Sequence, residues 1–316
     1  MLSRLLAIGL SALALGACAH GAGSTQRPQP VLGAEGGVDH VLVWTRDEQA
    51  ATRILRDRLG FTVGPASAYP DGIASKALAF GDRSYIQLLF ATDPETARRQ
   101  APTETAMLDL SYGPSSFGLR ADDLAAVRKR LEGSGVAIDP AAPSQTSSWA
   151  TLTLAQGLIA GEPFFVEYAG DAPEPGADGP PVTSSRHENG ARRLTAVWVL
   201  APDLDEAVAQ YARLGFVESR PVPSPIPGAT AMAIRAGTGW VLLVEPGTSD
   251  AAQAAGRWPH KIFGVSVEVA RLSETRARLK KGEPAAPRIY RGPFGDAVRV
   301  DTRRDLGLYV EFHQGR

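Results

Sequence analysis

Hydrophobic residues along this chain follow two patterns: short apolar runs, and one-sided stretches in which apolar residues lie three or four positions apart. The segment Val38–Leu89 contains both. It opens with a mainly apolar run at 38–44, continues with a one-sided stretch at 48–59, and closes with the apolar run Tyr85–Leu89. Spacings of three and four place side chains on one face of a helix, whereas short apolar runs between turn residues are typical of strands. The pattern predicts a buried strand, an amphipathic helix and then further strands.

Two kinds of residue mark the ends of the expected helices. Asp47 precedes the stretch 48–59, and Asp203 precedes a second stretch of the same kind. A carboxylate just before a helix accepts hydrogen bonds from backbone N–H groups that have no partner within the helix. Gly60 follows the first stretch, where a left-handed cap is needed. We therefore expect Asp47 and Asp203 to begin helices and Gly60 to end one.

The chain repeats part of itself. The segment Arg58-Leu-Gly-Phe61 recurs 155 residues later as Arg213-Leu-Gly-Phe216. In both copies an apolar run follows, and its central residue lies 27 positions after the glycine, at Gln87 in the first copy and at Leu242 in the second. Because chance rarely preserves such a register, the two segments indicate a duplicated structural unit.

A second pair of segments repeats in the same order. Residues 117–131 resemble residues 263–279, and apolar runs follow them at Pro163–Tyr168 and Leu308–Phe312. The chain is therefore predicted to contain four βαβββ modules, two in each of two domains. This alternation of strands with single helices favours an α+β fold in which helices cover one face of a curved, mixed sheet.

These repeats also set the expected domain boundaries. The first domain is predicted at 37–170 and the second at 194–314, and residues 171–193, rich in Pro, Gly, Asp and Ser, are predicted to link them. Residues 18–36 have the composition of a flexible tether.

Residues 1–17 are expected to be a targeting segment and no part of the fold. They carry one positive charge, at Arg4, followed by the apolar run Leu5–Leu15, which is too short to span a bilayer as a stable helix. Leu15-Gly-Ala-Cys18 resembles the lipobox of bacterial lipoproteins, which implies a signal peptide at 1–17 and lipidation of Cys18. A plain secretory signal is the alternative. Ala19 after the cysteine implies, by the same resemblance, the outer membrane, so the expected location is the cell envelope, facing the periplasm.

Composition excludes several classes of function. Lys and Arg number 33 against 34 Asp and Glu, with no run of basic residues, so a nucleic-acid partner is not expected. Cys18 is the only cysteine, which leaves the domains without a disulfide framework or a thiolate metal site. Motifs for a phosphate-binding loop, a zinc-protease helix and a serine nucleophile elbow are all missing from the sequence.

Several short motifs together resemble one superfamily. The opening Asp39-His-Val41, the segment Tyr85-Ile-Gln-Leu88 and the segment Phe165-Val-Glu-Tyr168 join the repeated Arg-Leu-Gly-Phe segment in an order that resembles the vicinal-oxygen-chelate superfamily, and within it the glyoxalase-like domains related to bleomycin-resistance proteins. The resemblance covers most of 38–314. It implies that the two modules of a domain enclose a cleft, which holds a divalent metal or simply a ligand.

The resemblance also implies which residues line the cleft of the first domain. The four positions that bind metal in the superfamily fall on His40, Gln87, Ser116 and Glu167. His40, Gln87 and Glu167 are the candidates to bind one divalent ion, such as zinc, manganese, nickel or iron, and Glu167 is also the candidate base. The set lacks the two histidines and one carboxylate typical of oxygen-activating iron, which disfavours a ring-cleaving dioxygenase.

Other roles for these residues stay open. His40 can be a core histidine with both ring nitrogens hydrogen-bonded, and Gln87 and Glu167 can bind backbone groups or a polar ligand. Trp149, expected on a strand of the second module, can stack on a ligand or pack in the core. His187, in the predicted linker, can fold over the cleft.

The second domain offers less chemistry. The positions that match the four above are Ala196, Leu242, Ile262 and Glu311, and three of these side chains cannot bind a metal. We expect this half to have a structural role or to bind an apolar ligand, with Glu311 hydrogen-bonded on a terminal strand. The neighbouring His313 is expected to be solvated.

These observations favour an envelope-tethered protein that binds a small molecule in the cleft of the first domain without catalysis. The alternative is a divalent-metal-dependent lyase or isomerase that uses His40, Gln87 and Glu167. A third possibility is a structural protein of the envelope.

Overall fold

The computed structural model describes residues 31–101, 112–140, 148–155, 157–169, 185–249, 261–282 and 287–315. The predicted targeting segment, Cys18, most of the predicted tether and most of the predicted linker lie outside the described residues. The predictions made for them therefore stay predictions.

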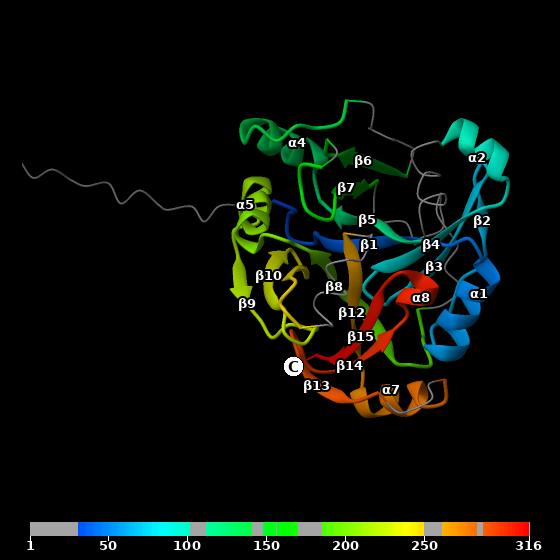
Figure 1. Cartoon of the computed structure of the whole chain (residues 1–316). Coiled ribbons are helices and arrows are strands. Elements are labelled where there is room, and N and C mark those ends of the chain that lie inside the picture. The colour runs from blue at the N-terminus through cyan, green and yellow to red at the C-terminus, as the bar shows by residue number, and fades with distance from the viewer. Residues whose placement is uncertain are drawn as a thin grey trace, which may run out of the picture.

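The first domain is built on a curled, mixed sheet with the strand order β2-β3-β4-β1-β5-β7-β6 (Figure 1). Parallel pairing joins β1 to β4 and β5 to β7, and the other neighbours are antiparallel. The strands are β1 (Gly37–Trp44), β2 (Ser67–Ala68), β3 (Ile73–Ala79), β4 (Tyr85–Ala91), β5 (Gly113–Arg120), β6 (Trp149–Thr153) and β7 (Pro163–Tyr168). The opening strands of the two modules, β1 and β5, lie side by side at the centre of the sheet.

The second domain repeats this plan in a sheet with the order β13-β14-β15-β12-β8-β11-β10-β9. Its strands are β8 (Ala191–Leu200), β9 (Ser219–Pro221), β10 (Thr230–Ala236), β11 (Gly239–Glu245), β12 (Ile262–Val269), β13 (Ile289–Gly292), β14 (Gly295–Asp301) and β15 (Tyr309–Gln314). Here too the opening strands of the two modules, β8 and β12, are central neighbours. The predicted α+β fold of tandem βαβββ modules is confirmed.

The predicted helices form where the sequence indicated. They are α1 (Glu48–Arg53), continued by the π-helical turn η1 (Ile54–Arg58), α2 (Pro94–Gln100), α4 (Leu124–Gly133), α5 (Leu204–Leu214), α7 (Leu272–Leu279) and α8 (Arg303–Leu306). Asp47 accepts a hydrogen bond from the Ala50 N–H, and Asp203 accepts one from the Glu206 N–H. Gly60 has φ of +78°, as the predicted left-handed cap requires. The short helices α2 and α8 were not anticipated.

The inner faces of the two sheets pack together with the helices in one core. Val41 and Val43 of β1 belong to the same buried cluster as Val197 and Val199 of β8, and Phe312 of β15 joins them. Leu55, Leu131, Tyr211 and Leu279 contribute from the helices α1/η1, α4, α5 and α7. Because one core serves both domains, the opposite faces of the two sheets point away from each other. We call them the first outer face and the second outer face.

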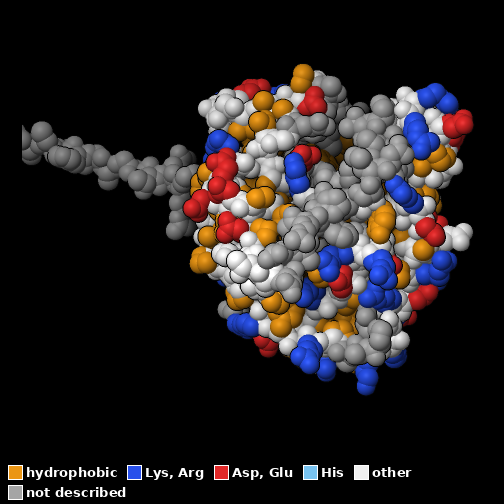
Figure 2. All heavy atoms as spheres, in the orientation of Figure 1, with side chains coloured by type: hydrophobic (Ala, Val, Ile, Leu, Met, Phe, Trp, Pro, Cys, Tyr) orange, Lys and Arg blue, Asp and Glu red, His pale blue; other side chains and the backbone are white. Residues whose placement is uncertain are grey.

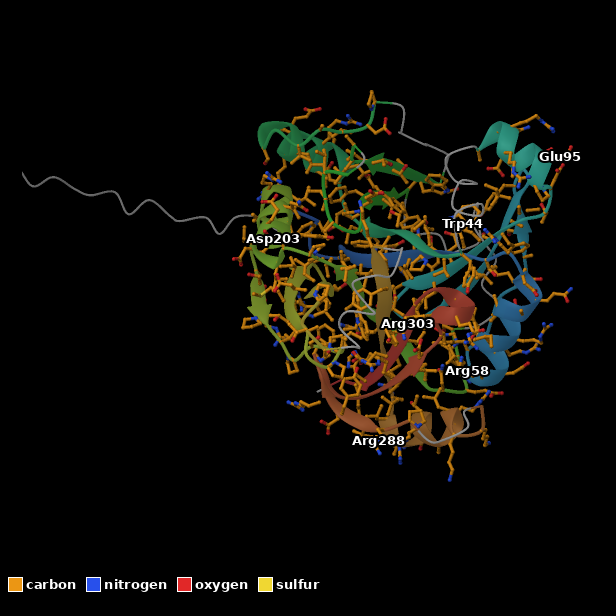
Figure 3. The ribbon with its side chains drawn as sticks, in the orientation of Figure 1. Trp44, Arg58, Glu95, Asp203, Arg288 and Arg303 are labelled. Carbon is orange, nitrogen blue, oxygen red and sulfur yellow. The ribbon has the colours of Figure 1, made fainter. Side chains whose placement is uncertain are left out.

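Polar contacts at the edge of this core also join the domains. Arg58, labelled in Figure 3, reaches from η1 to α8, where its Nη1 lies 3.3 Å from Asp305 Oδ2. His187 and Asn189 precede β8 and are buried between the domains. The side-chain amide of Asn189 donates to the Leu59 backbone carbonyl at 2.9 Å, and the backbone carbonyl of Asn189 accepts from the Thr275 hydroxyl at 2.7 Å.

The visible surface carries acidic and basic side chains interspersed with apolar ones (Figure 2). Within the described residues, no helix is long and apolar enough to cross a membrane.

Candidate functional site

The first outer face is organised around an irregularity in β1. The pairing of β1 with β5 shifts register between Val38 and His40, so Asp39 is an extra residue in the strand. A β-bulge of this kind re-aims side chains that regular alternation would separate. Asp39 and His40 consequently meet although they are adjacent in sequence, and Asp39 Oδ2 lies 2.7 Å from His40 Nδ1.

Asp39 is the centre of a buried polar cluster. It is 1% exposed, and its Oδ2 also accepts a hydrogen bond of 2.8 Å from the Tyr168 hydroxyl. Arg120 Nε lies 3.7 Å from Asp39 Oδ1, an ion pair that compensates the buried carboxylate charge. Tyr168 shares a further side-chain hydrogen bond with Tyr85. Burial, reinforced by the charge of Asp39, raises the pKa of both tyrosines, so both remain neutral hydrogen-bond donors.

The imidazole of His40 is held from several sides. It stacks on the Tyr85 ring, with 4.4 Å between centroids and 12° between planes, and Phe164 meets it edge-on at 5.3 Å. Gly118 of β5 leaves the space that the ring occupies, since a Cβ there would lie 2.7 Å from His40 Cε1. Nδ1 faces Asp39, whereas Nε2 has no hydrogen-bond partner in the described part of the chain. The ring is therefore fixed and presents one unused nitrogen.

Three other predicted residues share this outer face. Gln87 lies two positions after Tyr85 on β4, and its Nε2 is 3.4 Å from the Tyr69 hydroxyl. Ser116 lies two positions before Gly118 on β5 and donates to the Glu162 carbonyl at 2.6 Å. Trp149 of β6 pairs with Tyr168 and is therefore on the same side of the sheet. All three side chains are partly buried, so the structure brings them to one partly open surface.

Trp44, labelled in Figure 3, extends this surface at the end of β1. It is 3% exposed and packs in a small apolar cluster with Ile73 and Leu89. The first outer face thus has an apolar end and a polar end, with His40 at the polar one.

Glu167 does not belong to this set, which corrects the prediction that it lines the cleft. Its Oε2 accepts a hydrogen bond of 2.7 Å from the Leu124 N–H at the start of α4, and the residue two positions before it, Phe165, is in the shared core. Because successive strand residues point to opposite faces, Glu167 is directed to the helix side. The closing strand instead places Phe164 opposite Gly118 on the His40 side.

Strand pairing also corrects the match between the domains. Ser266 of β12 pairs with Glu311, as Gly118 of β5 pairs with Phe164. Glu311 is therefore the counterpart of Phe164. The counterpart of Glu167 is Gln314, whose Oε1 accepts from the N–H of Leu272 at the start of α7. The sequence prediction had aligned Glu167 with Glu311, because each follows a valine in its closing strand. That alignment is shifted by three residues from the one that strand pairing shows.

The donors on the first outer face do not fit a divalent metal. Without Glu167, the predicted set is reduced to one imidazole nitrogen, one amide and one hydroxyl, and the Ser116 hydroxyl is engaged with a carbonyl. The neighbouring carboxylate of Asp39 is already bound to His40 Nδ1 and to the Tyr168 hydroxyl. Divalent ions in proteins are usually held by several histidine or carboxylate ligands. Among the residues that the structure describes, no group of three or more His, Cys, Asp or Glu side chains is arranged to hold an ion.

The second outer face is filled by its own side chains. Trp198 is 0% exposed and packs against Phe263 and Tyr309, with ring centroids 5.8 and 6.2 Å away. Ala196 and Leu242, the counterparts of His40 and Gln87, are also fully buried. The structural role predicted for this half stays a prediction.

A hydrogen-bonded chain crosses this filled face. The Trp198 indole N–H donates to Ser266 at 2.8 Å, and the Ser266 hydroxyl donates to Glu311 Oε1 at 2.7 Å. Tyr290 donates to the other oxygen of Glu311. Burial raises the pKa of Glu311 to about 7, although these hydrogen bonds favour its charged form.

Two histidines besides His40 are buried. His313 is 2% exposed, and its Nε2 is 2.9 Å from the Thr195 hydroxyl, so it is not solvated as predicted. His187 does not fold over the cleft. It accepts a hydrogen bond from the Thr62 N–H at 2.9 Å, and its Nε2 lies 3.0 Å from the Ala79 carbonyl. Burial lowers the pKa of each to about 4, so both imidazoles stay neutral near pH 7.

The chain belongs to the glyoxalase-like domain family, whose model matches residues 38–215. Solved structures share the fold at low identity. A hypothetical protein from Staphylococcus aureus is 13% identical with a TM-score of 0.55, covering 88% of this chain and 99% of its own. A mutant 4-hydroxymandelate synthase from Streptomyces coelicolor is 14% identical with a TM-score of 0.57, covering 89% of this chain and 93% of its own.

A third solved structure is a fusion of a xylose isomerase-like TIM barrel with a 4-hydroxyphenylpyruvate dioxygenase. It is 15% identical with a TM-score of 0.61, and the match covers 90% of this chain and 49% of that protein. No curated protein matches. At these identities the solved structures establish the fold, and the family identification confirms the resemblance to the vicinal-oxygen-chelate superfamily.

Sequence reasoning missed six residues that build the site: Asp39, Tyr85, Gly118, Arg120, Phe164 and Tyr168. The carboxylate next to His40 was visible as a signal. The sequence carries no signal for the β-bulge, however. In a regular strand, alternation would place Asp39 on the face opposite His40.

Proposed function

We propose that this glyoxalase-like protein binds a small organic molecule on the first outer face and that His40 is its principal polar contact. One observation carries the proposal: the imidazole is held by Asp39, Tyr85 and Phe164, yet Nε2 has no hydrogen-bond partner among the described residues. Pre-organised side chains bind a ligand at lower entropic cost than mobile ones. The partly exposed neighbours Gln87 and Ser116 would add polar contacts.

The first test uses benzamide, indole and benzoate as probes in ligand-observed NMR with the purified full chain. We expect at least one probe to bind, and the signal to weaken about tenfold in His40→Asn and less in Gln87→Leu. The matched control is Arg235→Gln, which changes a side chain over Trp240 on the second outer face. Equal binding by wild type and His40→Asn, or no binding of any probe, would contradict the proposal.

The alternative function is a divalent-metal-dependent lyase or isomerase that uses His40, Gln87 and Glu167. The hydrogen bond between Glu167 and the Leu124 N–H weighs against it. The test is thermal melting with zinc, manganese, nickel or ferrous ion. An ion at 100 times its dissociation constant adds about 2.7 kcal/mol of stability if it binds only the folded protein. Stabilisation that disappears in both His40→Ala and Glu167→Ala would favour the enzyme.

We also propose that the protein is tethered to the bacterial envelope through lipid on Cys18, facing the periplasm. The support is the Leu15-Gly-Ala-Cys18 segment, followed by a stretch with the composition of a tether. In a bacterial host we expect Cys18→Ser to move the protein from the membrane fraction to the soluble fraction, because each buried CH₂ of an acyl chain contributes about 0.8 kcal/mol. Unchanged fractionation, or a mature mass without acyl chains, would contradict this.

A further inference from the structure

The Asp39–His40 pair has a defined polarity. In a neutral imidazole one nitrogen donates a hydrogen bond and the other carries a lone pair. Nδ1 lies 2.7 Å from a carboxylate oxygen, which can only accept, so the hydrogen-bond network assigns the proton to Nδ1 and the lone pair to Nε2. The unused nitrogen of the site is therefore a proton acceptor.

The ring would keep its carboxylate partner if it took up a second proton. An imidazolium formed by protonation at Nε2 would face Asp39 Oδ2 at 2.7 Å, in the arrangement by which a buried carboxylate supports a catalytic histidine. The neutral phenol of Tyr168 and the nearby guanidinium of Arg120 hold that carboxylate in place. In a histidine that serves only packing, both ring nitrogens have hydrogen-bond partners. In His40 the carboxylate of Asp39 is the partner of Nδ1, and Nε2 is left for a ligand.

We propose that Asp39 and His40 form a metal-independent proton acceptor for a flat aromatic ligand that carries an acidic hydroxyl group. The proposal rests on ligand binding at the first outer face. The ligand O–H bond breaks, its proton goes to His40 Nε2, and the electron pair stays on the ligand oxygen as an aromatic oxyanion. The reverse transfer restores both partners, so no co-reactant is needed.

The side chains around Nε2 define this class of ligand. Tyr85 and Phe164 flank the imidazole, and Phe164 is partly exposed, so a planar molecule that reaches Nε2 would lie beside aromatic side chains. Gln87 has a second amide N–H besides the one directed to Tyr69, and it can donate to the oxyanion. A hydroxyl on an aromatic ring combines flatness with the acidity that proton transfer to an imidazole requires.

The experiment uses 4-nitrophenol, which is colourless as the phenol and yellow as the phenolate. The purified full chain is added in the presence of EDTA at a pH below the pKa of the free phenol. We expect the yellow band to appear with wild type and to be lost in His40→Asn. In Asp39→Asn the band should fall about tenfold or more, as when an outer partner of a functional histidine is removed. Tyr168→Phe, which keeps the carboxylate, should weaken it less.

The matched control is His313→Asn, the same substitution at a buried histidine of the second sheet, which should keep the band. Circular dichroism melting checks that each variant is folded. Three results would overturn the proposal: a yellow band that persists in His40→Asn, bound 4-nitrophenol that stays colourless, or no binding of 4-nitrophenol. In each case the proposed binding function stands if benzamide, indole or benzoate still binds in a His40-dependent way. Failure of the proton-transfer proposal can therefore be told apart from failure of the binding proposal.

Discussion

The two outer faces of this molecule are built on the same strand plan but differ in what fills them. On the first, His40, Tyr85 and Gln87 lie on neighbouring strands around a partly open surface. On the second, Ala196, Trp240 and Leu242 occupy the equivalent register. Trp198, with no exposed surface, fills the space beside them. Duplication thus preserved the backbone, while the side chains that plug or open the face decide whether a ligand can enter.

The two faces also differ in the surroundings of their buried carboxyl groups, Asp39 on the first and Glu311 on the second. The carboxylate of Asp39 has a histidine, a tyrosine and an arginine as its neighbours. Glu311 is hydrogen-bonded to two hydroxyl groups, and burial outweighs their effect on its pKa. The first arrangement is suited to proton transfer, the second to packing.

The largest effect should come from emptying the filled face. Trp198→Ala removes a fully buried ring and its hydrogen bond to Ser266, and we expect a loss of about 3–5 kcal/mol in the free energy of unfolding. The matched change on the first face, Trp149→Ala, removes a partly exposed ring and should cost under about 1 kcal/mol. Urea unfolding measures both, and equal losses would remove the distinction between a filled and an open face.

The second effect depends on pH. Because the pKa of Glu311 is raised from 4.5 to about 7, the folded protein holds a proton that the unfolded chain releases in this range. The stability that Glu311 contributes is therefore fully present below pH 4.5 and is lost as pH rises to about 7. We expect the wild-type free energy of unfolding, relative to Glu311→Gln, to fall by up to about 3 kcal/mol across this window.

Comparing the two proteins isolates Glu311, because His187 and His313 have lowered pKa values that affect both equally. Their contribution has the opposite sign: stability lost to these histidines at low pH returns as pH rises from about 4 to 6.5. Parallel pH curves for wild type and Glu311→Gln would show that the carboxyl of Glu311 is not perturbed.

A smaller effect tests the space around His40. Gly118→Ala places a Cβ 2.7 Å from His40 Cε1 and 2.8 Å from Nδ1, so the ring must shift. We expect a loss of about 1–3 kcal/mol in stability together with loss of probe binding. Gly133→Ala is the matched control, because a Cβ there meets nothing within 4 Å and alanine favours the helix. Unchanged probe binding in Gly118→Ala would show that the ligand does not contact the His40 imidazole.

The smallest effect concerns a feature that both domains share. Glu167→Ala and Gln314→Ala each remove a side-chain acceptor from the start of a helix, at α4 and α7. We expect each to lower stability by about 1 kcal/mol without changing probe binding, since neither side chain is on the proposed binding surface. Calorimetry and NMR titration measure the two quantities. If probe binding were lost in Glu167→Ala but not in Gln314→Ala, Glu167 would be part of the binding site after all.

Much of the fold could be predicted because its signals are local. Asp47 and Asp203 begin helices and Gly60 ends one, since caps depend on backbone groups a few residues away. The repeated Arg-Leu-Gly-Phe segments gave the duplication, because a repeated unit carries the same local pattern. His40, Gln87 and Ser116 were assigned to one cleft by the superfamily resemblance, which rests on short local motifs.

Tertiary structure alone decided the rest. Whether Glu167 or Phe164 faces His40 depends on the register between β5 and β7, which a short Val-Glu match cannot specify. The meeting of Asp39 with His40 depends on a bulge, and the space for the ring depends on Gly118 across the strand pair. The sharing of one core by both domains depends on how the two inner faces pack. Local pattern determined the elements of this protein, but long-range pairing determined its site, because a one-residue change of register turns every side chain to the other face.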